Sequence, residues 1–558
     1  MTTEQTKSTG ETRWLGVVTL ATLLLIEIPY LVAYLQEARA FIFTGMLWSS
    51  HDFSQYAAAM REGAATASWL IHDHLTAEPH APAFMYPLYV GLGKLAGLLH
   101  LDLQAVYHGA EIVARVILLV AIYRFCAAVF SDIGERRLAF TLIVFSSGLA
   151  FWVLLFQIAL PIDGIRGLPL TLEHSRPEVN TFLVFFTAPH LMLSLAFLFI
   201  AAGGYLASWT RPVPRPAAST LGAVLGLGLT NPFGLVTLCV VLVGHLAAMW
   251  LRGHHPPRRS WLSAALAMLV AAPFLVYNLL VFGGDPFWGV VYGTQNVIPT
   301  PPAPFLAMGF APVLALAALG LPGFLREPGP GRWLVVVWIA LSLALICIPT
   351  TVGFQRRFVF GVQPMLGLVA TIGLMAVWRW ARRDDTPCRA FGRRMGRHLV
   401  MVTLFSSTVC FYGILLTIVA RPAAVAGHGS AFQPVALEAA GQWLVTAMGP
   451  DDVVLADAPT GNYLAGLTPG RVFVGHPIGT LGHDEKRQAT WRFYLGKDDD
   501  AGHGFLAANN IRYVVYGPHE RALGAAPPGV TPALRSVYET PEVTIYVVEP
   551  VAASTAPR

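Results

Sequence analysis

Residues 14–35 read WLGVVTLATLLLIEIPYLVAYL, and Glu27 is the one charged side chain among them. A helix needs about 20 predominantly apolar residues to cross the hydrocarbon core of a bilayer, so this stretch predicts a membrane span. Its length, its glutamate and the lack of a small-residue cleavage site argue against a cleaved signal peptide. We therefore expect a retained transmembrane helix.

Similar apolar runs recur along the chain and predict about eleven transmembrane helices. The expected spans are 14–35, 105–126, 138–158, 181–207, 217–230, 233–251, 261–282, 306–325, 333–349, 358–380 and 398–420. Composition agrees, because 55% of the 558 residues are hydrophobic and only 12% are charged, whereas soluble domains average about 25% charged residues. The sequence excludes a water-soluble multidomain protein and predicts an α-helical polytopic membrane protein.

Arginines in the short loops predict the orientation. If the N-terminus is cytoplasmic, the inner loops hold the pairs Arg136–Arg137 and Arg258–Arg259 and the block 379–397, as the positive-inside rule requires. An odd number of spans then places everything after residue 420 outside. The preference for Arg over Lys, with abundant Ala, Gly and Pro, is typical of a GC-rich bacterial genome. We expect a multi-pass protein of the bacterial cytoplasmic (inner) membrane with an extracytoplasmic C-terminal domain.

Two domains are expected, a transmembrane domain at 1–420 and an extracytoplasmic α/β domain at 421–558. Outer loop one, 36–104, should contain juxtamembrane helices, because the apolar stretch 82–100 contains Pro87, three glycines and Lys94. Counting that stretch as a full span would put the later arginines outside. The tail alternates helical segments, expected at 433–448, near 460–466 and at 483–495, with short apolar runs at 453–456, 472–474, 511–516 and 543–548. This alternation predicts a small soluble α/β domain with a largely parallel sheet.

Polar side chains that could do chemistry are densest in outer loop one. In SSHDFSQYAAAMREG, residues 49–63, Asp52 and Tyr56 stand four positions apart and would share one face of a helix. The simplest interpretation is that Ser50 or Asp52 caps a surface helix. The alternative is a carboxylate with a chemical role.

Histidines form a second cluster in the same loop. His72 and His74 flank Asp73, and His80 follows, so these side chains could bind a divalent metal of unknown identity. His72 and His74 converge only if the chain is extended there, because positions i and i+2 face different sides of a helix. Structural hydrogen bonds are the alternative, as they are for His190 and for His476 in the tail. No other cofactor is indicated.

The order of these parts resembles the GT-C superfamily of polyprenyl-phosphate-sugar-dependent glycosyltransferases. An N-terminal helix precedes an outer loop with Asp52 before Tyr56, and Tyr86-Pro87 leads into a juxtamembrane helix. Further similarities lie at Glu178–Phe182, Ala188–His190, Asn231–Phe233, Gln355–Phe358, Gly475-His476 and Tyr513–Pro518. The chain looks like protein O-mannosyltransferases, aminoarabinose transferases and a bacterial branch of glycosyltransferases. The similarity covers nearly the whole chain.

The resemblance implies an inverting glycosyltransferase that moves a sugar from a polyprenyl-phosphate donor to an envelope glycan, lipid or protein acceptor at the outer face. Asp52 matches the loop-one carboxylate, so it is expected to act as the base or to organise one, with Tyr56 orienting it. The family often has a second acid in the next outer loop. Asp163, Glu173 and Glu178 are the candidates there; Asp163 is preferred as catalytic, and Glu178 could contact the substrate. Charges of a solvated loop are the alternative.

Arg356 and Arg357 lie in an outer connection, against the positive-inside bias. A guanidinium group suits phosphate oxygens, so this pair is expected to bind the donor phosphate. Contact with anionic lipid is the plainer alternative. Lys94 is a second phosphate candidate, although snorkelling to the headgroups would explain it equally well.

A different class of function stays open: a non-catalytic polyprenyl-lipid-binding membrane module, or a transporter of lipid-linked glycans. Transporters usually show internal repeats and charges near the bilayer midplane, whereas here no repeat is visible and the carboxylates favour the outer rim. The motifs GxxxxGK[ST], HExxH and GxSxG do not occur, so nucleotide hydrolysis, zincin proteolysis and hydrolase chemistry lack support. The expected partners are the lipid-linked donor, membrane lipids and an unidentified acceptor, with no nucleic acid.

Overall fold

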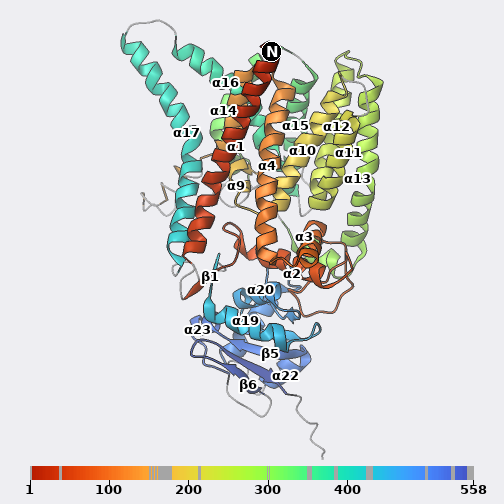
Figure 1. Ribbon diagram of the computed structural model, residues 1–558, viewed down its shortest axis with the longest axis vertical. Coiled ribbons are helices and arrows are strands. Elements are labelled where there is room, and N and C mark those ends of the chain that lie inside the picture. Colours follow the sequence, from red (N-terminus) through yellow and green to blue (C-terminus); the bar gives the residue numbers. More distant parts are fainter. Residues whose placement is uncertain are drawn as a thin grey trace, which may run out of the picture. The chain divides into compact units, whose positions relative to one another are not determined.

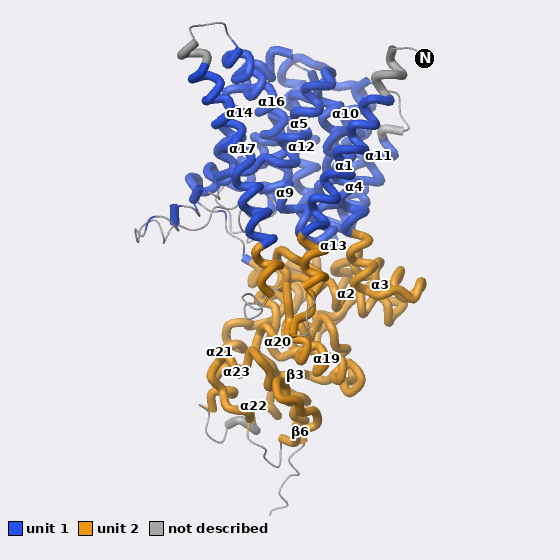
Figure 2. The backbone as a smooth tube through the Cα atoms, turned by 60° about the vertical axis from the view of Figure 1, so that its left-hand side comes forward, with its two compact units in different colours: residues 1–28, 111–279, 297–416 blue, residues 29–110, 280–296, 417–558 orange. Residues whose placement is uncertain are grey.

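A computed structural model describes most of the chain. The described residues are 3–36, 40–149, 152–153, 156–157, 160, 179–210, 215–297, 300, 302–327, 329–347, 355–382, 387–422, 431–496, 501–528 and 534–549. They belong to two compact units, coloured in Figure 2. Unit 1 comprises 1–28, 111–279 and 297–416, and unit 2 comprises 29–110, 280–296 and 417–558. Unit 2 therefore contains both outer loop one and the tail. The division of the chain into domains at 1–420 and 421–558 stays a prediction from the sequence.

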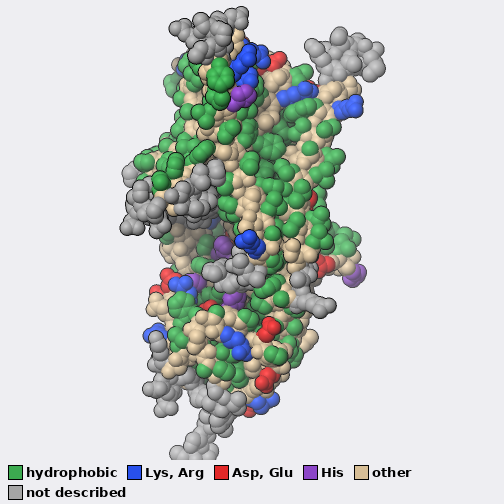
Figure 3. Space-filling view, turned by 90° about the vertical axis from the view of Figure 1, so that its left-hand side faces the viewer, with side chains coloured by type: hydrophobic (Ala, Val, Ile, Leu, Met, Phe, Trp, Pro, Cys, Tyr) green, Lys and Arg blue, Asp and Glu red, His purple; other side chains and the backbone are tan. Residues whose placement is uncertain are grey.

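The chain is a multi-pass membrane protein. Within the described residues, nine helices are long and apolar enough to cross a membrane. They are α1 (Thr3–Leu35), α4 (Leu103–Val129), α10 (Pro189–Ala207), α12 (Pro232–Leu251), α13 (Arg258–Gly284), α14 (Ala303–Phe324), α15 (Pro330–Cys347), α16 (Val362–Ala381) and α17 (Pro387–Ala420) (Figure 1). The helices α5 (Ile133–Phe145), α9 (Thr181–Val184) and α11 (Arg215–Thr230) and the 3₁₀ helix η4 (Gln355–Val359) are shorter. Hydrophobic side chains cover much of the surface of unit 1 in Figure 3.

Two predicted spans are not continuous helices. In the span predicted at 138–158, α5 ends at Phe145 and the described residues 146–149 are not helical. Beyond it, the Ser147 amide donates to Leu404 O and the Leu149 amide donates to Met308 O. Non-helical backbone is tolerated at membrane depth when other groups accept its hydrogen bonds, and this stretch meets that condition.

The span predicted at 181–207 divides into α9 and α10 because of Pro189. Proline has no amide hydrogen, so Pro189 cannot donate to the carbonyl of Phe185 four residues earlier. The Nε atom of Arg115, a side chain with 1% exposure, donates to that carbonyl at 3.0 Å instead. The same guanidinium lies 2.5 Å from Glu27 and 3.7 Å from Glu111. A buried arginine in unit 1 thus satisfies the backbone that the proline leaves open.

In unit 2, outer loop one forms two tightly packed helices, α2 (Phe53–Ala65) and α3 (Pro87–Leu99). A Cβ atom on Gly93 would lie 1.9 Å from the Met60 carbonyl oxygen, and one on Gly63 would lie 2.4 Å from the Val90 carbonyl oxygen. Only glycine permits so close an approach. With 13 residues, α3 is too short to cross a bilayer, as its proline and glycines predicted.

The tail forms a mixed five-stranded sheet in the order β4-β3-β5-β7-β6. Its strands are β3 (Val453–Leu455), β4 (Arg471–Val472), β5 (Ile511–Tyr516), β6 (Leu534–Glu539) and β7 (Thr544–Val548). Strands β4, β3 and β5 are parallel, as predicted, whereas β7 is antiparallel to both β5 and β6. Side chains alternate between two cores along β5, with Tyr513 and Val515 on one face and Val514 and Tyr516 on the other.

Three tail helices lie at predicted segments, namely α19 (Val435–Ala447), α20 (Ala458–Leu467) and α21 (His483–Tyr494). Two more, α22 (Ala501–Ala508) and α23 (Pro518–Ala522), were not predicted. The close approach of α20 to α2 again depends on glycine, since a Cβ atom on Gly466 would lie 3.1 Å from the Cα atom of Ser54. The tail thus packs directly on the helix that follows Asp52.

Outer loop one also pairs with the tail through its backbone. Strand β1 (Phe41–Phe43) is antiparallel to β2 (Phe432–Pro434), with Phe43 opposite Phe432. At the edge of the larger sheet, the Val472 amide donates to the carbonyl of His74 at 3.0 Å. These contacts hold the two segments in one unit.

Candidate functional site

Asp52 ends a short 3₁₀ helix, η1 (Ser50–Asp52), that leads directly into α2. Ser49 before it adopts the left-handed conformation, with φ 55°, and this turns the chain into the helix. The Asp52 side chain makes no capping hydrogen bond to α2 and is 29% exposed. The structure therefore does not show the helix-capping role that the sequence also allowed for Asp52.

His476 of the tail is a hydrogen-bond partner of Asp52. It follows β4 in the chain, is 2% exposed, and its Nε2 atom lies 2.8 Å from Asp52 Oδ1. Its Nδ1 atom lies 3.1 Å from the backbone nitrogen of Ile478. A backbone amide can only donate, so Nδ1 accepts, and the neutral ring carries its hydrogen on Nε2. His476 therefore donates to the carboxylate of Asp52.

His51 completes a group of three potential metal ligands. Its ring stacks on that of His476, with centroids 5.2 Å apart, and its Nε2 atom lies 3.5 Å from Asp52 Oδ1. Ligand atoms of His51, Asp52 and His476 lie within 4.8 Å of one another. A metal bound to Nε2 of His476 would force the ring hydrogen onto Nδ1, opposite the Ile478 amide hydrogen. The hydrogen bonding of His476 therefore does not suit a metal ligand.

Tyrosines line the adjoining turns of α2. Tyr56, one turn after Asp52, stacks on Tyr89 of α3, with centroids 4.3 Å apart and planes at 12°. The Tyr86 hydroxyl donates to Gln55 Oε1 at 2.8 Å and lies 2.9 Å from the Tyr292 hydroxyl. Tyr292 belongs to the π-helix η3 (Gly289–Gln295), and burial raises its pKa well above the ordinary value. The Tyr56 and Tyr86 rings also lie against each other, with centroids 5.8 Å apart, so the tyrosines form one packed cluster beside Gln55.

The predicted histidine cluster converges on a carboxylate. Nδ1 of His72 and Nε2 of His74 lie 3.1 and 3.3 Å from the two oxygens of Glu62. Burial alone would raise the pKa of Glu62, but the hydrogen bonds from His74 and His72 outweigh burial and lower it. His80 instead accepts from the Asp73 amide at Nε2 and faces the Glu78 carbonyl at Nδ1. All three histidines are thus engaged with protein groups.

Asp73, between these histidines, is an almost fully buried carboxyl group with 6% exposure. Its Oδ1 atom accepts from the Leu75 amide at 2.9 Å, and its buried Oδ2 atom has no hydrogen-bond partner among the described residues. Burial raises the pKa of Asp73 to about 7, against the lowering effects of the Leu75 amide and Lys486. Lys486 forms an ion pair with Glu78 at 2.6 Å.

The remaining predicted site residues are dispersed. Lys94 of α3 donates to Thr66 O at 2.8 Å and lies over the Trp69 ring, so local contacts within unit 2 account for it. In unit 1, Arg356 is 6% exposed and Arg357 lies 4.5 Å from the Phe233 ring. His190 stands in the first turn of α10. Asp163, Glu173 and Glu178 lie outside the described residues.

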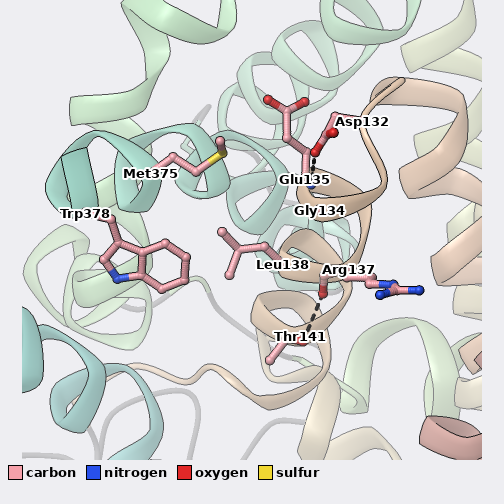
Figure 4. A pocket seen from close by; sticks show the side chains of 8 residues that line it. All are labelled: Asp132, Gly134, Glu135, Arg137, Leu138, Thr141, Met375 and Trp378. Carbon is pink, nitrogen blue, oxygen red and sulfur yellow. Dashed lines mark hydrogen bonds between the residues drawn. The ribbon is translucent and has the colours of Figure 1, made fainter. Parts of the chain in front are cut away.

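A pocket of about 370 Å³ lies between α5 and α16 in unit 1. Figure 4 shows Leu138, Met375 and Trp378 around it, with Asp132 and Glu135 at one end. The start of α5 belongs to a loop predicted to be cytoplasmic. None of the eight residues that line this pocket is a predicted site residue.

Sequence reasoning named Asp52 but not the residues around it. His476, His51, Gln55, Glu62 and Tyr292 were absent from the predicted site. Only His476 carried a usable signal, because Gly475-His476 directly follows an apolar run, and ligands of α/β sheets gather at the carboxyl ends of parallel strands.

Over most of its length, the chain has the fold of the GT-C glycosyltransferases. No protein-family model and no curated protein matches the sequence, so the likeness rests on solved structures.

Three solved structures illustrate the likeness. The archaeal oligosaccharyltransferase AglB from Archaeoglobus fulgidus, in complex with an inhibitory peptide and a dolichol-phosphate, has a TM-score of 0.57 and 13% identity, covering 90% of this chain and 69% of its own. ArnT from Cupriavidus metallidurans, bound to undecaprenyl phosphate, has a TM-score of 0.51 and 13% identity, covering 97% of this chain and 100% of its own. The arabinofuranosyltransferase AftD from Mycobacteria has a TM-score of 0.54 and 16% identity, covering 97% of this chain but 42% of its own.

Proposed function

We propose that the protein is an inverting glycosyltransferase that uses a polyprenyl-phosphate sugar donor at the outer face of the bacterial cytoplasmic membrane. Two solved structures of this fold contain dolichol-phosphate or undecaprenyl phosphate, and this supports a lipid-phosphate donor. The observation that carries the proposal is the carboxylate of Asp52, partly exposed and hydrogen-bonded by a buried histidine of the tail. The acceptor is a hydroxyl or amide of an envelope glycan, lipid or protein.

For a hydroxyl acceptor, the step balances as follows. The acceptor oxygen attacks the anomeric carbon of the donor, and a new glycosidic C–O bond forms. The bond from that carbon to the phosphate oxygen breaks, and the polyprenyl phosphate leaves with the electron pair. Asp52 takes the acceptor proton as general base and later releases it to water. Because the attack occurs opposite the leaving group, the configuration at the anomeric carbon inverts.

Donor binding is assigned to Arg356 and Arg357. Each carries a planar guanidinium group that suits phosphate oxygens, and the contact of Arg357 with Phe233 brings together two of the segments on which the resemblance rests. Positive charge near the leaving phosphate would stabilise the charge that develops there. Asp163 and Glu178 stay proposed as the second acid and as a substrate contact, and Tyr56 as the residue that orients Asp52.

The test is a transfer assay with purified full-length protein in detergent. Undecaprenyl-phosphate arabinose and undecaprenyl-phosphate mannose serve as separate donors, and bacterial membrane lipid and envelope glycan fractions serve as acceptors. We expect Asp52→Asn to lower the transfer rate by at least about 100-fold, within the range for loss of a general base. Asp451→Asn, a fully exposed aspartate of the same unit, is the matched control and should keep the wild-type rate.

Three outcomes decide between the hypotheses. Transfer by the wild type, with its loss in Asp52→Asn alone, supports the proposal. Full activity of Asp52→Asn would overturn the role of Asp52 but not the class. Saturable binding of undecaprenyl phosphate without transfer of either sugar would favour the alternative, a non-catalytic lipid-binding module or glycan transporter.

A further inference from the structure

The imidazole ring of His476 is held in one orientation by its surroundings. Its ring is 2% exposed, and both of its nitrogens are engaged, Nε2 with Asp52 and Nδ1 with the Ile478 amide. With Nδ1 accepting a hydrogen bond, the ring hydrogen lies on Nε2 and points to Asp52. His476 is therefore a donor to the carboxylate rather than a base of its own.

The loop that carries His476 is held from several sides within unit 2. The Thr480 amide donates to His476 O at 3.0 Å, and the Thr480 hydroxyl donates to Leu75 O at 2.6 Å. Nε2 of Gln295 donates to Pro477 O and Thr480 O at 2.8 and 2.6 Å. A Cβ atom on Gly479 would lie 2.5 Å from a Leu75 side-chain carbon, so the loop also packs closely. Such support fixes the direction of the imidazole N–H.

On this basis, and resting on the proposed function, we propose that His476 is a positioning residue that orients the Asp52 carboxylate for proton abstraction. The Oδ1 atom of Asp52 accepts the hydrogen bond from His476 Nε2. The tail thus takes part in the reaction through Asp52 without touching the sugar. A displacement of about 1 Å in a reacting group can lower the rate about 100-fold. Holding the Asp52 carboxylate in place should therefore have a measurable effect on the transfer rate.

The experiment compares His476→Ala with His476→Gln in the transfer assay above. Alanine removes the donor, whereas the side-chain amide of glutamine offers an N–H at a similar reach. We expect His476→Ala to lower kcat by about 100-fold with the donor KM changed less than about twofold. His476→Gln should recover at least about tenfold of that loss. His483→Gln, a buried histidine of the same domain, is the control and should keep wild-type kcat.

Folding is monitored by the melting temperature of each variant, which separates positioning from structural support. Equal losses of kcat in His476→Ala and His476→Gln, with melting temperatures lowered to match, would overturn the inference, as would an unchanged kcat in His476→Ala. If the wild type transfers sugar and Asp52→Asn is inactive while His476→Ala is unaffected, this inference fails and the proposed function stands. If the wild type transfers neither sugar, both fail.

Discussion

Glu62 of α2 and His74 of the following segment lie 3.3 Å apart through Oε2 and Nε2, while Nδ1 of His74 lies 2.9 Å from the carbonyl oxygen of Gly470 in the tail. Both neighbours of the ring are hydrogen-bond acceptors, the Glu62 carboxylate and the Gly470 carbonyl. His74 thus joins the carboxylate of outer loop one to the tail backbone.

Replacing Glu62 with Gln should weaken this junction. The variant removes the negative charge of the carboxylate that His72 and His74 contact, and hydrogen bonds to charged groups contribute about 1.5–3 kcal/mol each. We expect the free energy of unfolding to fall by about 2 kcal/mol, seen as a lower melting temperature and faster tryptic cleavage of the tail. Glu485→Gln, at an exposed position of α21, is the control. Indistinguishable melting curves for the two variants would contradict the prediction.

Asp73 predicts a pH dependence of stability. Its pKa is about 7 in the folded protein, against an ordinary value of 3.8. As pH rises from about 4 to 7, the unfolded chain loses this proton while the folded protein keeps it, so stability falls through that window and levels off above it. The cost reaches the order of 4 kcal/mol.

Asp73→Asn should remove this cost and keep the acceptor for the Leu75 amide. We expect the melting temperature of the variant to equal that of the wild type near pH 4 and to exceed it increasingly up to pH 7.5. Glu520, whose pKa burial also raises to about 7, is present in both proteins and cancels in the difference. A difference that stays constant with pH would refute the assignment.

Chelation should leave transfer activity intact. Nδ1 of His476 accepts from the Ile478 amide, so Nε2 carries a hydrogen instead of the lone pair that a metal needs. We expect protein treated with EDTA and then desalted to keep at least about half of its transfer rate, since the step we propose needs no metal. Loss of activity that Mn²⁺ or Mg²⁺ restores would show that His51, Asp52 and other groups do bind a metal.

Arg357 offers a test of donor binding. Lysine keeps the charge but not the planar fork, so Arg357→Lys should raise the donor KM by about tenfold, the cost of roughly one good hydrogen bond. Arg357→Ala should raise it further. Arg258→Ala, in a loop predicted to be cytoplasmic, serves as the control. Equal donor KM values in all three variants and the wild type would remove Arg357 from the donor site.

Sequence patterns predicted the elements well where local periodicity determines them. The run at 511–516 coincides with β5, and the helix expected at 483–495 is α21. Strand β6 was missed because it directly follows a segment rich in Pro, Ala and Gly that reads as a linker. The sequence predicted one continuous span at 181–207 because hydropathy does not reveal the helix break at Pro189. It also does not show that the carbonyl of Phe185 accepts a hydrogen bond from Arg115.

The candidate site shows the limit of local patterns. Asp52 was found from its place in loop one, but its hydrogen bond to His476 joins residues 424 positions apart. Periodicity carries no information about contacts at that separation. The parallel strands β3 and β4 could have directed attention to the residues that follow them, because ligands gather at the carboxyl ends of parallel strands. The antiparallel strands β7 and β6 lie beyond β5 in the sheet and leave the ends of β3 and β4 unchanged.

The pairing of β1 with β2 sets an order on biogenesis. Thr44 and its partner Ala431 are 387 residues apart, so a ribosome completes every described membrane-spanning helix before the second strand exists. Contacts of such sequence separation form late, because the long loop between them must close first. The Asp52–His476 hydrogen bond depends on the same closure, so each new molecule gains it only after synthesis has passed the last described membrane helix.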